Sequence, residues 1–443
     1  MRTIILGAGI AGLTAADAES RAGREVVVVD GYRHVGGNHI SRDIGPYSFD
    51  IGSFLFFPGF PLFELFPEVR ERCVPLAVAY QRIAPDGQVR RYPFDRREVL
   101  GQPPHRLAAD LLSLAAGRLR RSPPQSIADA TVRLIGTRLY RRLGLENYLT
   151  RFYGLPPAGI DPLFADKRMR QVVQGAQIGR LVHAAVLRLL RGAPPPAAAP
   201  TPAMVRPRDG FAAFYAPVRA GLEARGVRFR LGDPPRRILG SPGRFRLDTE
   251  GGAVRGERLV STLPLARLLR LIGEETALRS SRLTSLFVSF AGERGFTAPI
   301  LYNFHAAGQW KRLTMHSDAY GPAGGRAYLS VEITGSDPAS PEAAFSDFRL
   351  HTAASGLFDG DLRLEGSTVT DDAYPVYARG VAAEIARARA AAAAAGIVLA
   401  GRQGLHDYLP TAWHVMDQVR AELARAPAPV PAPVAAVQQE GAG

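Results

Sequence analysis

Three glycines and one acid near the start of the chain have the spacing of a phosphate-binding turn. Gly7, Gly9 and Gly12 follow the apolar residues 4–6, and Asp30 ends a second apolar run. Gly7 permits a tight turn, Gly9 leaves room for a pyrophosphate against the backbone, and Gly12 lets a helix pack closely on the strand. The helix N-terminus attracts phosphate, and Asp30 is placed to accept hydrogen bonds from a ribose. The pattern predicts a dinucleotide site. A plain strand–turn–helix connection is the alternative, and the motif alone does not separate FAD from NAD.

A second group of small and polar residues follows this turn. Gly36, Gly37 and Asn38 come directly after the second predicted strand, where two glycines allow a long ligand to approach the backbone. Near the other end of the chain, Gly401 and Arg402 follow a short apolar strand. Segments far apart in the sequence are therefore expected to build one extended nucleotide site.

With these motifs the chain resembles the flavoprotein superfamily that contains monoamine oxidases, protoporphyrinogen oxidases, phytoene desaturases and UDP-galactopyranose mutases. The resemblance covers about residues 1–425. It implies that Asp30, in place of the usual glutamate, and the glycine pair continue an FAD site. It also implies that Gly401, Arg402 and Tyr408 lie along the same cofactor. FAD is therefore the predicted cofactor.

Finer features resemble the mutase branch of that superfamily. Residues 36–38 read Gly-Gly-Asn as in the mutases, whereas amine oxidases usually have Gly-Gly-Arg, and residues 373–377 resemble a mutase segment that bears Tyr374. The chain also departs from the mutases, which carry an aspartate shortly after the tyrosine of the last motif. Here Tyr408 is followed by Leu-Pro-Thr-Ala. The departure leaves the substrate and the type of reaction open.

Four side chains are candidates for the chemistry at the substrate. The forked guanidinium groups of Arg168 and Arg312 suit phosphate oxygens. Tyr374 is a candidate hydrogen-bond donor to the substrate or its phosphate, and His39 is expected beside the flavin because it follows the Gly-Gly-Asn loop. The alternatives are solvated arginines and packing roles for Tyr374 and His39. No metal site is predicted, because the histidines are scattered and Cys73 is the only cysteine.

These residues support three readings of the function. The first is an FAD-dependent oxidoreductase that oxidises a small molecule held between an FAD domain and a substrate lobe. The second is an isomerase like the UDP-galactopyranose mutases, which use reduced FAD on a nucleotide sugar. The third is a non-catalytic flavoprotein homologue, which the departure after Tyr408 allows.

The elements that must position these residues alternate between strand and helix, which predicts an α/β fold. We expect a discontinuous Rossmann-type FAD-binding domain and an α+β substrate lobe with a helical block and an antiparallel sheet. A hairpin is predicted around the turn at residues 86–87, and a stiff linker at the prolines of residues 193–203. The expected bounds are residues 1–75, 205–265 and 396–425 for the FAD domain, 76–204 and 266–395 for the substrate lobe, and 426–443 for a disordered tail.

Composition describes a globular protein of more than one lobe, with 443 residues of which 46% are hydrophobic. The net charge of +14 comes from arginine, since the chain has only two lysines. It indicates either the codon bias of a GC-rich genome or attraction to anionic substrates or membranes. The basic stretches 106–121 and 180–191 could touch a membrane, but we favour their packing within the substrate lobe. We expect a cytoplasmic enzyme with a small-molecule substrate and no nucleic-acid partner, and the oligomeric state stays open.

Overall fold

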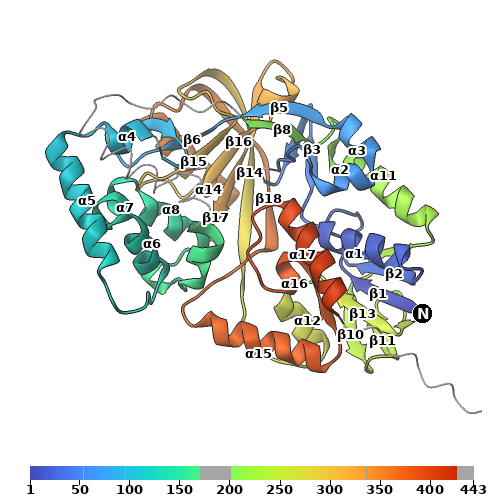
Figure 1. The fold of residues 1–443 in the computed structure, drawn as a ribbon. Coiled ribbons are helices and arrows are strands. Elements are labelled where there is room, and N and C mark those ends of the chain that lie inside the picture. Colours follow the sequence, from blue (N-terminus) through green and yellow to red (C-terminus); the bar gives the residue numbers. More distant parts are fainter. Residues whose placement is uncertain (53, 95, 170–200, 336–337, 339, 427–443) are drawn as a thin grey trace, which may run out of the picture.

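The computed structural model describes residues 1–443 apart from 53, 95, 170–200, 336–337, 339 and 427–443. The side chains of residues 96–97 and 168–169 are also outside the description. The predicted helix over 180–191, most of the predicted linker and the predicted tail from residue 427 on therefore lie outside the described residues. Figure 1 shows a helical block on the left, long antiparallel strands in the middle and a parallel sheet with its helices on the right.

Five parallel strands form the sheet that carries the glycine turn, in the order β19-β13-β1-β2-β9. The first two strands are buried along almost their whole length, as expected for a parallel sheet covered on both faces. The predicted α/β fold with a Rossmann-type sheet is confirmed. The bounds are β1 (Arg2–Leu6), β2 (Glu25–Asp30), β9 (Arg228–Leu231), β13 (Arg258–Ser261) and β19 (Val398–Leu399).

Alternate side chains of β1 and β2 enter two different cores. Ile5 and Val26 pack on the face that is covered by α1 (Ile10–Arg21), α11 (Gly210–Ala224) and α17 (Ala412–Arg425). Ile4 and Val27 pack on the opposite face, together with a small antiparallel sheet and two helices. These elements are β10 (Pro235–Leu239), β11 (Phe245–Thr249), β12 (Val254–Gly256), α12 (Leu265–Leu271) and α15 (Val381–Ala394).

A second sheet has seven strands in the order β18-β14-β17-β16-β15-β6-β7, antiparallel except between β15 and β6. The helix α14 (Pro341–Ala354) shares a core with apolar side chains of this sheet. The predicted hairpin at residues 86–87 is confirmed between β6 and β7. The bounds are β6 (Tyr80–Ile83), β7 (Val89–Arg91), β14 (Ser280–Arg294), β15 (Ile300–Asn303), β16 (Arg312–Met315), β17 (Ala327–Thr334) and β18 (Phe358–Pro375).

The helical block and several short elements complete the described chain. The block contains α4 (Arg96–Leu100), α5 (Pro104–Arg118), α6 (Ile127–Ile135), α7 (Thr137–Arg142) and α8 (Leu145–Tyr153), followed by η1 (Pro157–Gly159) and the π-helical η2 (Ala165–Met169). Two further antiparallel pairs are the hairpin of β3 (Ser41–Ile44) with β4 (Tyr47–Asp50) and the long-range pair of β5 (Val74–Val78) with β8 (Thr201–Val205). The remaining helices are α2 (Pro61–Leu65), α3 (Pro67–Arg72), α13 (Ser317–Tyr320) and α16 (Gly401–Gly404).

The prediction of a stiff linker over residues 193–203 is wrong for its last three residues. Residues 201–203 belong to β8, whose backbone pairs with β5, so this segment has an antiparallel partner that its proline content does not reveal. Among the described helices, none combines the length and apolar character that crossing a bilayer requires.

Candidate active site

One cavity of about 970 Å³ joins the carboxyl edge of the parallel sheet to the seven-stranded sheet. The structure brings most of the predicted site residues onto its wall, whereas Gly12 and Gly401 lie behind it. The side chain of Arg168 is outside the described residues. The predicted residues on the wall are Gly7, Gly9, Asp30, Gly36, Gly37, Asn38, His39, Arg312, Tyr374, Arg402 and Tyr408.

The glycine turn between β1 and α1 is packed so tightly at Gly7 and Gly12 that side chains would not fit there. Gly7 has a φ of +101°, and a Cβ on Gly12 would lie 1.8 Å from the carbonyl oxygen of Gly7. Gly9 differs, because a Cβ there would lie 3.6 Å from its nearest neighbour, the Cα of Gly37. The N–H of Gly36 donates to the carbonyl of Ala8 at 2.8 Å. The two glycine segments therefore lie side by side as bare backbone, and this forms a cradle on the cavity wall.

The N-terminus of α1 lies at this cradle and has no side-chain cap. Its N-cap is Gly9, which supplies no side-chain cap, and the first turn carries no acid. The first N–H groups of a helix need acceptors, and the helix dipole places partial positive charge at the same point. This end of the cavity suits a phosphate group.

Asp30 has a structural task beside its predicted one. Its carboxylate accepts hydrogen bonds from the N–H groups of Ala8 at 2.6 Å and Tyr32 at 2.8 Å, so it fixes the glycine turn against the end of β2. A carboxylate offers about four lone-pair sites, which leaves acceptor capacity toward the cavity. Binding of a ribose by Asp30 stays a prediction.

His39 lies in an aromatic cluster on the wall of the cavity. Its Nδ1 is 2.6 Å from the hydroxyl oxygen of Tyr215, and its ring stacks on Phe211 with centroids 5.0 Å apart. Burial, and then the charge of Arg402, lowers the pKa of His39 to about 3. At neutral pH His39 is therefore an uncharged ring held in a fixed orientation, which makes it a hydrogen-bonding group rather than a cation.

Arg312 and Lys311 share one buried carboxylate at the other end of the cavity. Arg312 donates from Nε to Glu332 Oε1 at 2.7 Å, and the Nζ of Lys311 is 3.7 Å from Glu332 Oε2. The ion pair with Glu332 holds the pKa of Arg312 well above its usual value despite burial. Burial lowers the pKa of Lys311 to about 8. Two cations against one carboxylate leave this cluster with a positive charge at neutral pH.

Aromatic rings surround this cationic cluster. The ammonium group of Lys311 lies 4.7 Å from the ring centre of Phe152 and 4.8 Å from that of Tyr374, within cation–π range. Tyr302 stacks on Tyr92 with centroids 4.2 Å apart, and Arg312 lies over the Tyr302 ring. This end of the cavity is therefore apolar along its walls and charged at one point.

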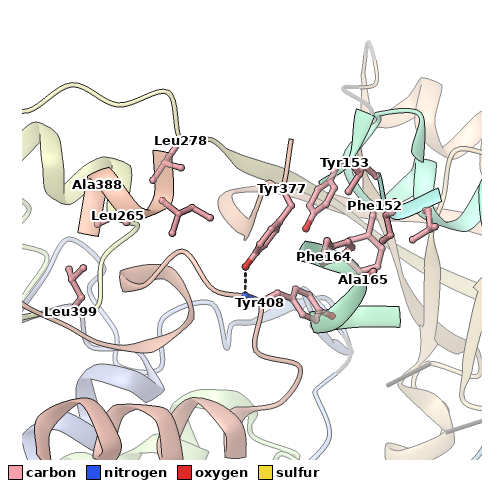
Figure 2. Close-up of a cluster of buried hydrophobic side chains, with 14 of the residues drawn as sticks. Phe152, Tyr153, Phe164, Ala165, Leu265, Leu278, Tyr377, Ala388, Leu399 and Tyr408 are labelled. Carbon is pink, nitrogen blue, oxygen red and sulfur yellow. Dashed lines mark hydrogen bonds between the residues drawn. The ribbon is translucent and has the colours of Figure 1, made fainter. Parts of the chain in front are cut away.

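The C-terminal segment closes the cavity near the glycine cradle. The N–H of Gly401 donates to Gln418 at 2.7 Å, and a Cβ there would approach Ala11 to 2.5 Å, so Gly401 packs against α1. Arg402 lies over the ring of Tyr408, and its Nε is buried without a hydrogen-bond partner among the described residues. Tyr377, in the same segment as Tyr374, is buried, and its hydroxyl oxygen accepts the N–H of Tyr408 at 2.9 Å (Figure 2).

Sequence reasoning missed Lys311 and Glu332. Neither was a candidate: Lys311 directly precedes Arg312, and Glu332 lies inside an apolar strand. The signal that was available for Lys311 is its residue type, since it is one of two lysines in a chain where arginine supplies nearly all positive charge. Glu332 gave no such signal. Among the described residues, no group of three or more histidines, cysteines or acids has the arrangement of a metal site.

Comparison with known proteins supports the fold. The sequence pattern of an NAD(P)-binding Rossmann-like domain matches residues 5–69. No curated protein matches the sequence. A solved structure of reduced UDP-galactopyranose mutase gives a TM-score of 0.78 at 18% identity, with 95% of this chain and 94% of the other covered.

Two further solved structures share the fold at lower similarity. Cyclohexylamine oxidase from Brevibacterium oxydans IH-35A gives a TM-score of 0.63 at 16% identity over 96% of this chain and 98% of its own. A fatty acid isomerase from P. acnes that produces CLA gives 0.61 at 14% identity, with the same coverage. At these identities the likeness shows a shared fold, and at that level it confirms the resemblance predicted from the motifs.

Proposed function

We propose that the protein is a flavoenzyme that binds FAD along the glycine-lined part of the cavity and acts on a small molecule at the Lys311–Arg312 end. The observation that carries this proposal is the single cavity, whose wall contains both the phosphate-binding turn and the cationic cluster. Its volume is at the upper end of the range for small-molecule sites, as a cofactor and a substrate together would need.

The residues along the cradle fit the parts of FAD. The bare backbone of Gly9 and Gly37 and the uncapped start of α1 suit the pyrophosphate, and Asp30 suits the ribose. The unpartnered Nε of Arg402 is a donor that a bound cofactor could satisfy. FAD, when bound, would supply the capacity to accept or return an electron pair. The protein residues would bind and orient the reactants and exclude water.

The substrate end favours an anionic molecule with an apolar part. The excess positive charge at Lys311 and Arg312 lies on the cavity wall and is screened from water by aromatic rings. A buried charge is costly unless it is paired, so an anionic group of the substrate would stabilise this cluster. The ring of Tyr374 lies beside the same point and is positioned to contact the bound molecule.

An FAD-dependent oxidoreductase is our first proposal for the reaction, and a mutase acting on a nucleotide sugar is the second candidate. The second is favoured by the TM-score of 0.78 to UDP-galactopyranose mutase and by the fact that a nucleotide sugar is an anion of the required kind. Solved structures of this fold also include an amine oxidase and a fatty acid isomerase. Both net oxidation and isomerisation therefore occur on this fold.

Cofactor binding is tested by purifying the protein, recording its flavin spectrum, and titrating the apoprotein with FAD. A Gly9→Ala variant has room for its methyl group and should fold, but the methyl group narrows the cradle, so we expect FAD affinity to fall by about tenfold or more. Gly159→Ala, at a glycine outside the cavity wall where the nearest atom to an added Cβ is 3.9 Å away, is the matched control. Absence of both a flavin spectrum and FAD uptake would contradict the proposal.

The reaction is tested by incubating oxidised and dithionite-reduced protein with UDP-galactopyranose and related nucleotide sugars. A ring-contracted product formed only by reduced protein would establish the mutase. Consumption of oxygen or an artificial acceptor with amines or carboxylates, and no ring-contracted product, would establish the oxidoreductase. FAD binding with neither activity would point to a non-catalytic homologue.

A further inference from the structure

The helix α5 packs into the helical block by one face. Its buried residues are Leu107, Asp110, Leu114 and Gly117, and they face α6 and α7. The contact is close, because a Cβ on Gly117 would lie 2.6 Å from the carbonyl oxygen of Val132 in α6. This face accounts for the packing that the sequence predicts for the stretch 106–121.

The opposite face of α5 is also apolar, and the described residues leave it exposed. Leu112 is 71% exposed and Leu119, directly after the helix, is 79% exposed, which are the two largest values among the exposed large apolar residues. Steps of about 100° per residue place both leucines on one side of the helix, together with the exposed Ala108, Ala115 and Ala116. Figure 1 shows α5 at the left edge of the molecule, with α6 and α7 on its inner side. We call these five residues the α5 outer face.

The charges around this face are almost all positive. Arg106 and Arg118 flank it on its two sides, and Arg120 and Arg121 follow the end of the helix. The one acid of α5, Asp110, is buried and bonds Arg138 and Arg142. The nearest acid to the basic end is Asp129, 4.0 Å from Arg120. A face with exposed leucines, basic flanks and no acid is complementary to a negatively charged apolar boundary.

We propose that the α5 outer face docks this protein onto the surface of an anionic lipid membrane. Leu112 and Leu119 enter the boundary between headgroups and acyl chains, and the flanking arginines pair with lipid phosphates. The helix lies in the plane of the surface, because its inner face stays packed on α6 and α7. The cavity residues take no part in this contact, so the proposal stands independently of the flavin chemistry.

The expected binding is reversible and depends on lipid charge. One short apolar face gives weak binding by itself, and each arginine near an anionic surface adds about fivefold in affinity. The contact therefore requires both the leucines and the arginines. It should weaken at high salt, because salt screens the attraction between the arginines and the surface.

The test is sedimentation of the full-length protein with vesicles of phosphatidylcholine alone and of phosphatidylcholine mixed with phosphatidylglycerol. We expect binding to the mixed vesicles at low salt, little binding to the neutral ones, and a loss of at least about tenfold in Leu112→Glu/Leu119→Glu. Arg118→Gln/Arg121→Gln, which leaves the leucines in place, should lose about twentyfold to thirtyfold. The matched controls are Leu350→Glu and Arg349→Gln on α14, where Leu350 is 64% exposed, and they should bind like the wild type.

Three results would overturn the proposal: no binding of the wild type to anionic vesicles, equal loss in the α14 controls, or unchanged binding in both α5 variants. Circular dichroism and flavin content establish that the variants are folded. Light scattering on the same samples detects self-association. A wild-type dimer that becomes a monomer in Leu112→Glu/Leu119→Glu, with no vesicle binding, would assign the α5 outer face to a second copy of the chain instead.

Discussion

Lys311 is the residue whose surroundings have the clearest measurable consequence. Its side chain is 3% exposed, and burial lowers its pKa from 10.5 to about 8. Between those pH values the unfolded chain keeps the proton that the folded protein has released, so the stability of the folded protein rises with pH in this window. Keeping the ammonium group charged in the fold costs on the order of 3 kcal/mol.

We therefore predict that the difference in unfolding free energy between the wild type and Lys311→Met depends on pH. From neutral pH to about pH 10, it should shift by up to about 3 kcal/mol in favour of the wild type, because only the wild type loses this buried charge. Denaturant unfolding at a series of pH values measures the shift. Lys167→Met, at the other lysine, is the control for losing a lysine that is 35% exposed and paired with Asp407. A difference that stays constant with pH would show that Lys311 is not desolvated.

The site residues differ in whether a short stretch of sequence is enough to predict them. Gly7, Gly9 and Gly12 could be predicted because the turn demands them at fixed spacing in one short segment. The partnership of Arg312 with Glu332 could not, because it depends on the register of β16 on β17, where the two residues lie opposite each other. Apolar strand patterns indicate that strands exist but do not specify which strands become neighbours or how they align.

At the scale of elements, the hairpin β3–β4 is joined to the start of α11 by a buried ion pair. Arg206 lies just before the turn into α11 and is fully buried, and its Nε donates to Asp50 in β4 at 2.8 Å. Its other nitrogens donate to the carbonyl oxygens of Ser48, Pro207 and Arg208. Asp50 also accepts a hydrogen bond from Ser41 at 2.8 Å, so its carboxylate connects both strands of the hairpin to Arg206.

Arg206→Met should therefore destabilise the protein by about 3–5 kcal/mol, since it leaves the Asp50 carboxylate buried without its cation. Arg219→Met breaks an exposed pair with Glu223, with side chains 46% and 44% exposed, and should cost less than about 1 kcal/mol. Both values come from denaturant unfolding. Adding Asp50→Asn to Arg206→Met should recover part of the loss, and a double variant that is less stable than Arg206→Met would argue against the ion pair as the cause.

Elements were predictable where their own residues carry the pattern. The helices α11, α15 and α17 are of this kind, because each has an apolar face or high alanine content in its own residues. The strand β18 was not predicted as one element. Much of its length is polar and exposed, and it is ordered by its pairing with the apolar strand β14. Tertiary pairing here outweighs local propensity.

At the scale of the whole molecule, three histidines in three different places are kept uncharged by the fold. Burial is the main cause in each case, and it lowers the pKa of His39 and His316 to about 3 and that of His351 to about 4. His316 accepts the backbone N–H of Asp50, and Trp310 donates to His351 at 2.9 Å. The rings of His316 and His351 are thus fixed as acceptors, each in its own part of the structure.

These three histidines should make the protein sensitive to acid. In the unfolded chain these histidines bind protons below pH 6.5, whereas in the folded protein they stay uncharged down to about pH 3 to 4. The unfolded state therefore gains protons first, and the stability of the folded protein falls as pH decreases through this window. Three such groups together give a slope of on the order of 4 kcal/mol per pH unit near pH 5. Denaturant unfolding between about pH 7 and pH 4 measures the slope, and imidazole NMR titration of the folded protein should show these three rings uncharged at pH 5. A flat stability profile, or rings that titrate near pH 6.5, would contradict the burial on which the prediction rests.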